Sequence, residues 1–102
     1  MLVAPNDLRA FDAGAIRPGC KVAFDGWSRV RDVQAQVRLS QRKALDAGVD
    51  RLILVFGDTW ANRQAVKAAG PPLRRAFPLT SRQVLGALRE GRDPGANGIV
   101  FV

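Results

Sequence analysis

Residues 51–57 read RLILVFG and contain the longest apolar run in the chain, residues 52–56. A short run that is apolar at consecutive positions is typical of a strand that is covered on both faces. Asp58-Thr59 comes directly after it and predicts the start of a helix over residues 60–69, which Gly70 ends. We therefore expect a central strand followed by a helix, the basic arrangement of an α/β domain.

Two strands and a helix are predicted before this run. Residues 8–16 and 20–27 are expected to form a hairpin around the RPG sequence at 17–19, where Pro and Gly favour a turn. Residues 29–47 carry apolar side chains at helical spacing, and Ser28 is the expected N-cap.

A further helix and a terminal strand are predicted after residue 79. Thr80 and Gln83 have the spacing of a capping box. The expected buried stripe of this helix is Val84, Leu85 and Leu88. Residues 99–102 read IVFV and predict the last strand. The element order β-β-α-β-α-α-β favours a single α/β domain over residues 1–102, a three-layer-like sandwich with a mixed sheet.

The composition excludes several classes of enzyme. The chain of 102 residues contains no histidine and one cysteine. Serine or cysteine nucleophiles activated by histidine, histidine-ligated zinc and an intramolecular disulfide are therefore excluded. Any catalysis would have to use carboxylates, hydroxyls, Lys or Arg, or a hard metal ion held by oxygen atoms.

The charge of the chain indicates an anionic partner. The formal net charge is +7, with 13 Arg and 3 Lys, and such a surplus favours contact with nucleic acid. The alternative is a soluble surface on which codon bias has selected Arg. The N-terminus lacks a basic signal-peptide region, and no run approaches the ~20 apolar residues of a membrane span. A cytoplasmic protein without a membrane partner is expected.

Several stretches together carry a family resemblance: DLRAFDA at 7–13, RVRDVQAQ at 29–36, RKALDAGVDRLILVFGDTWANRQAV at 42–66 and FPLTSRQVLGALREGRDPGANGIVFV at 77–102. The chain resembles the C-terminal domain of actinobacterial helix-turn-helix (XRE-type) regulators. That domain is similar to the restriction-endonuclease-like PD-(D/E)xK superfamily. The helix-turn-helix portion is absent from this sequence, so a stand-alone relative is expected.

The resemblance implies a metal site. In such nucleases, acids on the hairpin strands hold Mg²⁺, which activates water against a phosphodiester, and a helix residue orients the site. By motif position, Asp12 and Asp25 would be the acids and Gln34 the helix residue. Trp27 stands where the motif has an acid or Lys, and an indole cannot bind Mg²⁺. The resemblance therefore implies a degenerate site with no cofactor, and Mg²⁺ only if the site functions.

Other interpretations of these residues remain open. Asp25 could be a bend residue before Gly26, and Asp12 could be an edge-strand charge that opposes aggregation. Asp32 or Asp58 could instead supply a third ligand in a functional site.

Basic residues of the helix predicted over 29–47 are the candidates for phosphate contact, since helical spacing lets several of them face one backbone. They are Arg29, Arg31, Arg38, Arg42 and Lys43. A solvated helix face is the alternative. Trp27 and Trp60 could stack on bases or serve the core or a subunit contact.

Three functions follow as hypotheses. The first is a nucleic-acid-associated, nuclease-like domain that binds DNA or RNA without catalysis. The second is an interaction module that forms a homodimer or docks on a partner protein, such as a regulator or a component of a toxin–antitoxin system. It would use the tryptophans and the terminal strand. The third is an active Mg²⁺-dependent nuclease.

Overall fold

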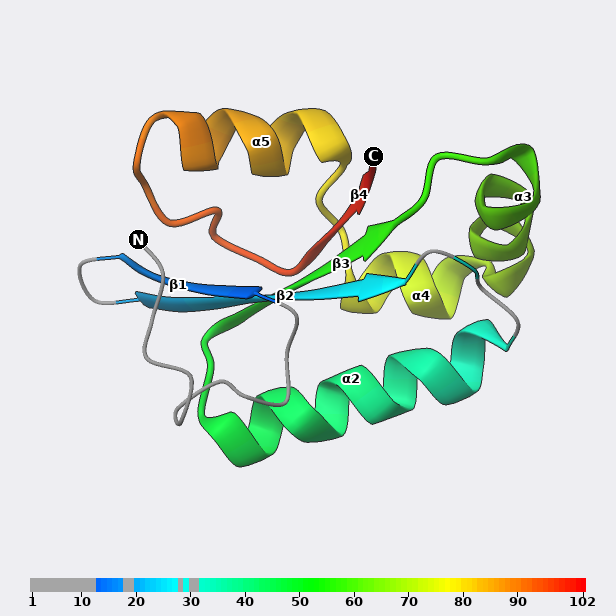
Figure 1. Ribbon diagram of the computed structural model, residues 1–102, viewed down its shortest axis with the longest axis horizontal. Helices are drawn as coiled ribbons and strands as arrows, with labels where there is room; N and C mark the ends of the chain where they lie inside the picture. The colour runs from blue at the N-terminus through cyan, green and yellow to red at the C-terminus, as the bar shows by residue number, and fades with distance from the viewer. Residues whose placement is uncertain (1–12, 18–19, 28, 30–31) are drawn as a thin grey trace.

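The computed structural model describes residues 13–17, 20–27, 29 and 32–102 (Figure 1). Four strands and four helices are defined within these ranges. The strands are β1 (Ala13–Arg17), β2 (Cys20–Trp27), β3 (Arg51–Phe56) and β4 (Gly98–Phe101). The helices are α2 (Val33–Ala47), α3 (Trp60–Ala69), α4 (Pro71–Ala76) and α5 (Ser81–Arg89).

The strands form one mixed sheet in the order β1-β2-β3-β4. β1 pairs with β2 in antiparallel fashion, whereas β2, β3 and β4 run parallel. β3 is an interior strand, as its continuous apolar run predicts, and Leu52, Ile53 and Leu54 are all buried. The mixed α/β sheet expected from the sequence is therefore confirmed.

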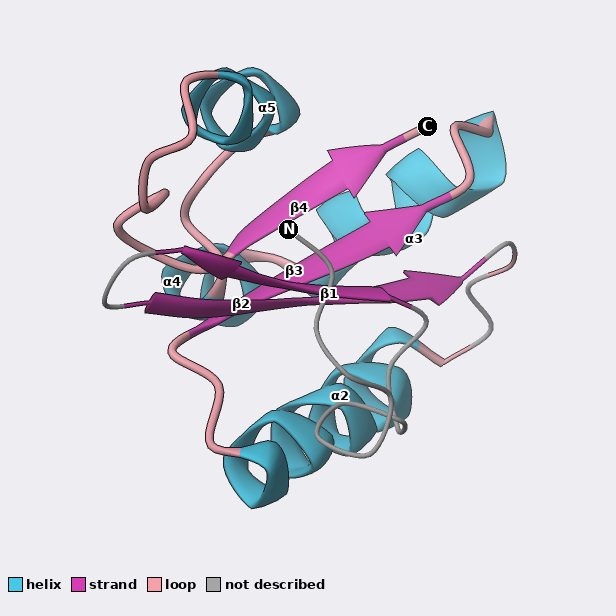
Figure 2. Cartoon of the chain, turned by 60° about the vertical axis from the view of Figure 1, so that its left-hand side comes forward, coloured by secondary structure: helices cyan, strands magenta, loops and turns pink. Residues whose placement is uncertain are grey.

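Helices cover both faces of the sheet, with α2 and α5 on opposite sides (Figure 2). On one face, α2, α3 and α4 bury Val37, Val66 and Leu73 against Ala23, Leu54, Phe56 and Ile99. On the other, Val84 of α5 packs with Val22, Ile53 and Val100. None of the described helices combines the length and the apolar composition that a membrane crossing requires.

α2 begins later than the sequence predicts. Its N-cap is Asp32, whose carboxylate accepts a hydrogen bond from the backbone N–H of Ala35, so the Ser28 cap predicted from the sequence is wrong. Gly48 ends the helix in the left-handed conformation, at φ 66°, which a residue without Cβ adopts readily. Arg29 therefore lies outside α2.

The segment after α3 also differs from the prediction. Gly70-Pro71-Pro72 ends α3, but the two prolines also begin α4, where the first helical positions need no intrahelical N–H donor. α5 has the predicted capping box between Thr80 and Gln83. Its buried stripe contains Ala87 in place of Leu85, which is 42% exposed.

The outer edge of β4 is closed by the segment that leads into α5. Ile99 donates its backbone N–H to Leu79 O. Ser81 Oγ donates to Ile99 O at 3.5 Å and accepts from the N–H of Phe101 at 3.1 Å. These contacts satisfy backbone groups that an edge strand would otherwise offer to another strand.

Candidate functional site

Asp25 lies within β2 and is 3% exposed. Its register partner on β3 is Leu54, at the centre of the sheet. A buried carboxylate is costly unless it is hydrogen-bonded or paired with a cation. Because β2 continues to Trp27, Asp25 is a strand residue rather than the bend residue that the sequence also allowed. Its chemistry depends on the side chains that meet it from α2.

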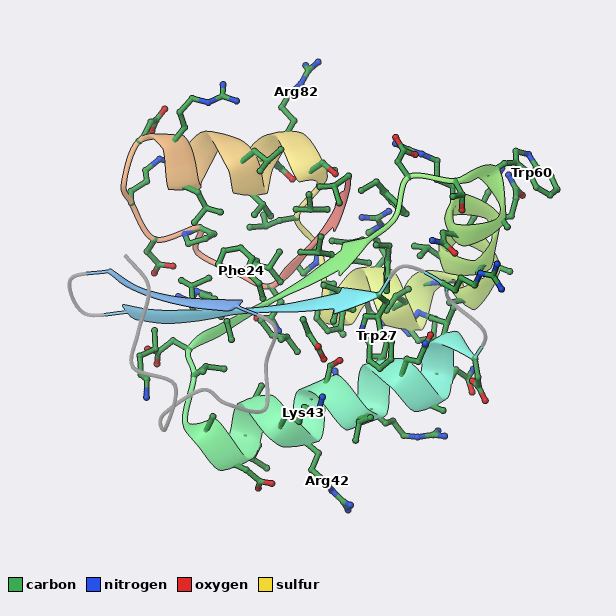
Figure 3. The ribbon with its side chains drawn as sticks, in the orientation of Figure 1. Phe24, Trp27, Arg42, Lys43, Trp60 and Arg82 are labelled. Carbon is green, nitrogen blue, oxygen red and sulfur yellow. The ribbon has the colours of Figure 1, made fainter. Side chains whose placement is uncertain are left out.

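Two side chains of α2 meet the Asp25 carboxylate, and we call these three residues the Asp25 cluster. Ser40, which is fully buried, donates from Oγ to Asp25 Oδ2 at 2.5 Å. Lys43 Nζ lies 3.9 Å from the same oxygen, with 28% of its side chain exposed. Figure 3 shows Lys43 directed toward the sheet, whereas Arg42 points away from it. The chain itself therefore compensates the charge of Asp25.

Two buried polar atoms between β2 and α2, close to the Asp25 cluster in sequence, have no hydrogen-bond partner among the described residues. Trp27 lies between the end of β2 and α2 (Figure 3). Its buried Nε1 has no hydrogen-bond partner among the described residues. Gln36, one turn before Ser40, donates from Nε2 to Arg29 O at 3.3 Å, but its buried Oε1 is also unpaired among the described residues. Each such atom costs about 1–3 kcal/mol.

The acids that the structure describes, Asp25, Asp32 and Asp58, do not come together as a metal site. Among the described residues, no group of three or more Asp, Glu or Cys side chains lies close enough to hold an ion. Asp32 caps the start of α2, roughly 12 Å along the helix axis from Ser40 at 1.5 Å per residue. Asp12, the other predicted metal ligand, lies outside the described residues.

Asp58, the other proposed third ligand, is engaged elsewhere. It follows β3, and its carboxylate accepts two hydrogen bonds from Arg63, at 2.5 Å from Nε and 3.2 Å from Nη2. Hydrogen bonding to Arg63 lowers the pKa of Asp58 below its ordinary value, and the same contact raises the pKa of Arg63. The pair stays ionised at neutral pH, and Asp58 is not directed at Asp25.

Gln34, the predicted orienting residue, does not face Asp25. It is exposed and lines a cavity of about 220 Å³ between α2 and α4, with Val37 and Leu73. The side of α2 that faces β2 instead carries Gln36, Ser40 and Lys43, at positions i, i+4 and i+7.

The other predicted phosphate contacts lie on the outside of the molecule. Arg38 and Arg42 are exposed, one turn apart on α2, and Arg29 is exposed ahead of the helix. None of the three forms an ion pair with a described residue. Arg31 lies outside the described part of the chain. We call Arg38 and Arg42 the α2 basic surface.

The two tryptophans lie in different environments. Trp27 is half-buried against the core, in accordance with one of its two predicted roles. Trp60 is 78% exposed at the start of α3 and does not belong to the core. A stacking or intermolecular role therefore remains open for Trp60 alone.

No protein-family model matches this chain, and neither a curated protein nor a solved structure is significantly similar to it.

Proposed function

We propose that this chain is a nucleic-acid-associated domain of the restriction-endonuclease-like type whose metal site does not support catalysis. The observation that carries the proposal is the contrast between two neighbouring residues of α2. Lys43 turns inward to Asp25, while Arg42 turns outward with Arg38 one turn away. The carboxylate of Asp25 is thus buried and its charge is balanced by Lys43. Arg38 and Arg42 are exposed on the outside of the same helix and form no ion pair with a described residue.

The arrangement around Asp25 supports the loss of catalysis. A hard cation such as Mg²⁺ needs several oxygen ligands and keeps part of its water shell. At Asp25 the carboxylate is buried, and Oδ2 already accepts from Ser40 and lies near the ammonium of Lys43. A cation that entered this position would be repelled by the Lys43 ammonium and would have to displace it.

The α2 basic surface supports the binding function. Arg38 and Arg42 lie on one helix face at i and i+4, the spacing at which side chains are neighbours. Guanidinium groups bind phosphate oxygens in a bidentate manner. The surface would read the phosphate backbone rather than the bases, so binding should depend strongly on salt and weakly on sequence.

The test is fluorescence anisotropy with a labelled DNA duplex over a range of salt concentrations. The double variant R38A/R42A is expected to bind more weakly and to reduce the slope of log K against log salt by about 2. The control R75A/R89A removes two exposed arginines that lie outside α2 and preserves the net charge of the double variant. If both double variants lose affinity equally, the α2 basic surface is not the binding site.

The exposure of Trp60 favours a second candidate, an interaction or oligomerisation module. Leu45 of α2 is also 81% exposed. The terminal strand does not favour this candidate, because Leu79 and Ser81 already occupy the outer edge of β4. A contact would instead centre on Trp60. Light scattering on the wild type and on Trp60→Ala tests it: a wild-type dimer that the substitution dissociates supports the module, and a monomer in both contradicts self-association.

A further inference from the structure

A second basic feature lies at β4, two strands away from β2 and the Asp25 cluster. Residues of α3, α4 and the start of α5, whose positions Figure 1 shows, line cavities beside β4. Two of them have volumes of about 180 and 270 Å³, and Arg74 and Ile99 line both. We call these two neighbouring cavities together the β4-edge groove. The position of Arg74 in this groove could not be predicted from the sequence, because the lining residues come from three helices and one strand.

None of the described residues that line the groove is acidic. Four of them are basic: Arg63, Lys67, Arg74 and Arg82. Lys67 and Arg74 are exposed and make no ion pair with a described residue. Arg82 lines the larger of the two cavities, and its side chain points outward from α5 (Figure 3).

Two other described arginines, by contrast, are neutralised by acidic neighbours. At the far end of α5, Arg92 pairs with Glu90, and Arg51 pairs with Asp93. The β4-edge groove therefore concentrates uncompensated positive charge in a concave place, where field lines converge on an anion.

One wall of the groove is held rigidly. The guanidinium of Arg63 lies over the ring of Phe101, 4.5 Å from its centre. Asp58 binds the same guanidinium through two hydrogen bonds. Ile99 and Phe101 provide an apolar floor beside these charges, and low-dielectric surroundings strengthen the attraction between a cation and an anion. A fixed cation also loses less entropy on binding than a free one.

We propose that the β4-edge groove binds a nucleotide phosphate, with Arg74 and Lys67 as the principal contacts. The phosphate could belong to a free mononucleotide or to a single strand of nucleic acid. Trp60 distinguishes the two sources, because it shares a face of α3 with Arg63 and Lys67 but does not line the cavities. Trp60 and Lys67 are seven residues apart on α3, roughly 10 Å along the helix axis. A strand could span this separation and stack a base on Trp60, whereas we expect the base of a mononucleotide to stay near the phosphate held by Lys67 and Arg74. This site is independent of the α2 basic surface.

The experiment uses two probes, adenosine monophosphate and a short fluorescein-labelled oligothymidylate, both at low salt. Calorimetry measures the first and anisotropy the second. Both are measured in the R38A/R42A background, so that loss of the α2 basic surface cannot be confused with loss of the groove. Arg74→Ala and Lys67→Ala are the test variants. Arg75→Ala is the matched control, because it removes the same charge from the same helix but lines neither cavity.

Arg74→Ala is expected to weaken at least one probe by roughly ten- to a hundredfold, the usual effect of losing a hydrogen bond between charged groups. Arg75→Ala should change affinity about twofold at most, because exposed charges are screened. Trp60→Ala should weaken only the oligothymidylate. Circular dichroism checks that each variant keeps its helices.

The two probes distinguish the two sources of the phosphate. Arg74-dependent binding of the mononucleotide identifies a free nucleotide as the ligand. Binding of the oligothymidylate alone, weakened by both Arg74→Ala and Trp60→Ala, identifies a strand. The proposal is overturned if the parent R38A/R42A protein binds neither probe, or if Arg74→Ala and Lys67→Ala behave like Arg75→Ala with both.

Discussion

Lys43 of α2 places its Nζ 3.9 Å from Oδ2 of Asp25 on β2, and Ser40 donates to the same oxygen. A strand carboxylate beneath a helix thus receives its counter-charge from that helix. The motif implied by the resemblance would supply a Lys or an acid at position 27, where this chain has Trp. The geometry brings a lysine to Asp25 from another element, and this contact ties α2 to the sheet.

Asp25→Asn is expected to lower the free energy of unfolding by roughly 1–3 kcal/mol, because it leaves Lys43 partly buried without its counter-charge and weakens the hydrogen bond from Ser40. Urea denaturation measures the change. Lys43→Ala should cost less, because solvent reaches 28% of that side chain. A stabilised Asp25→Asn would mean that the acid serves a function at the expense of the fold.

Gly98→Ala is expected to destabilise the protein by about 1–3 kcal/mol or more, as overpacking in a core does. A Cβ at this position would lie 2.5 Å from Val84 Cγ2 and 2.9 Å from Leu79 Cβ. Gly86→Ala is the matched control within α5, since its Cβ would meet nothing within 4 Å. It should stabilise the helix by roughly 0.5–1 kcal/mol. Thermal denaturation of both variants should show shifts of opposite sign.

The pair between Asp58 and Arg63 should contribute a pH-dependent term to stability. The pKa of Asp58 is lowered in the folded chain from 3.8 by its hydrogen bond to Arg63. Its contribution is therefore fully present above the pKa of the unfolded chain and disappears as pH falls through the lower folded value. An NMR titration of the carboxyl carbon should give a midpoint below 3.8 in the wild type and an ordinary midpoint in Arg63→Ala. Equal midpoints in the two proteins would contradict the paired geometry.

The two tryptophans should differ in their access to solvent. Trp60 is 78% exposed, and Trp27 is half-buried. Acrylamide should therefore quench the fluorescence of Trp27→Phe, which retains Trp60, more strongly than that of Trp60→Phe. Trp60→Phe should change stability by about 0.5 kcal/mol at most, as for other surface substitutions. Similar quenching of the two variants would show that Trp60 is covered in solution.

Much of the fold was predictable because its signals are local. The apolar run 51–57 predicts a buried strand, and the spacing of Thr80 and Gln83 predicts the cap of α5. The predicted start of α2 was wrong because Ser28 and Asp32 are both favourable N-cap residues, and the local sequence does not distinguish between them. α4 was missed because two prolines end one helix and can equally begin the next.

The candidate site was less predictable because its contacts are tertiary. The partners of Asp25 lie on another element, and only the i, i+4 and i+7 spacing of Gln36, Ser40 and Lys43 marks their common face. Gln34 was selected by motif position and lies on a different side of α2. The β4-edge groove had no linear signal, since Lys67, Arg74 and Arg82 belong to three different helices.

The most direct test of the central claim is to incubate the protein with a labelled DNA duplex in Mg²⁺ at low and moderate salt, and to record binding and strand integrity together. The account predicts that the duplex is bound at low salt, that affinity falls steeply as salt rises, and that the DNA stays intact. Mg²⁺-dependent cleavage that is lost in Asp25→Asn would contradict an inactive site. The absence of binding at low ionic strength would contradict the nucleic-acid function itself.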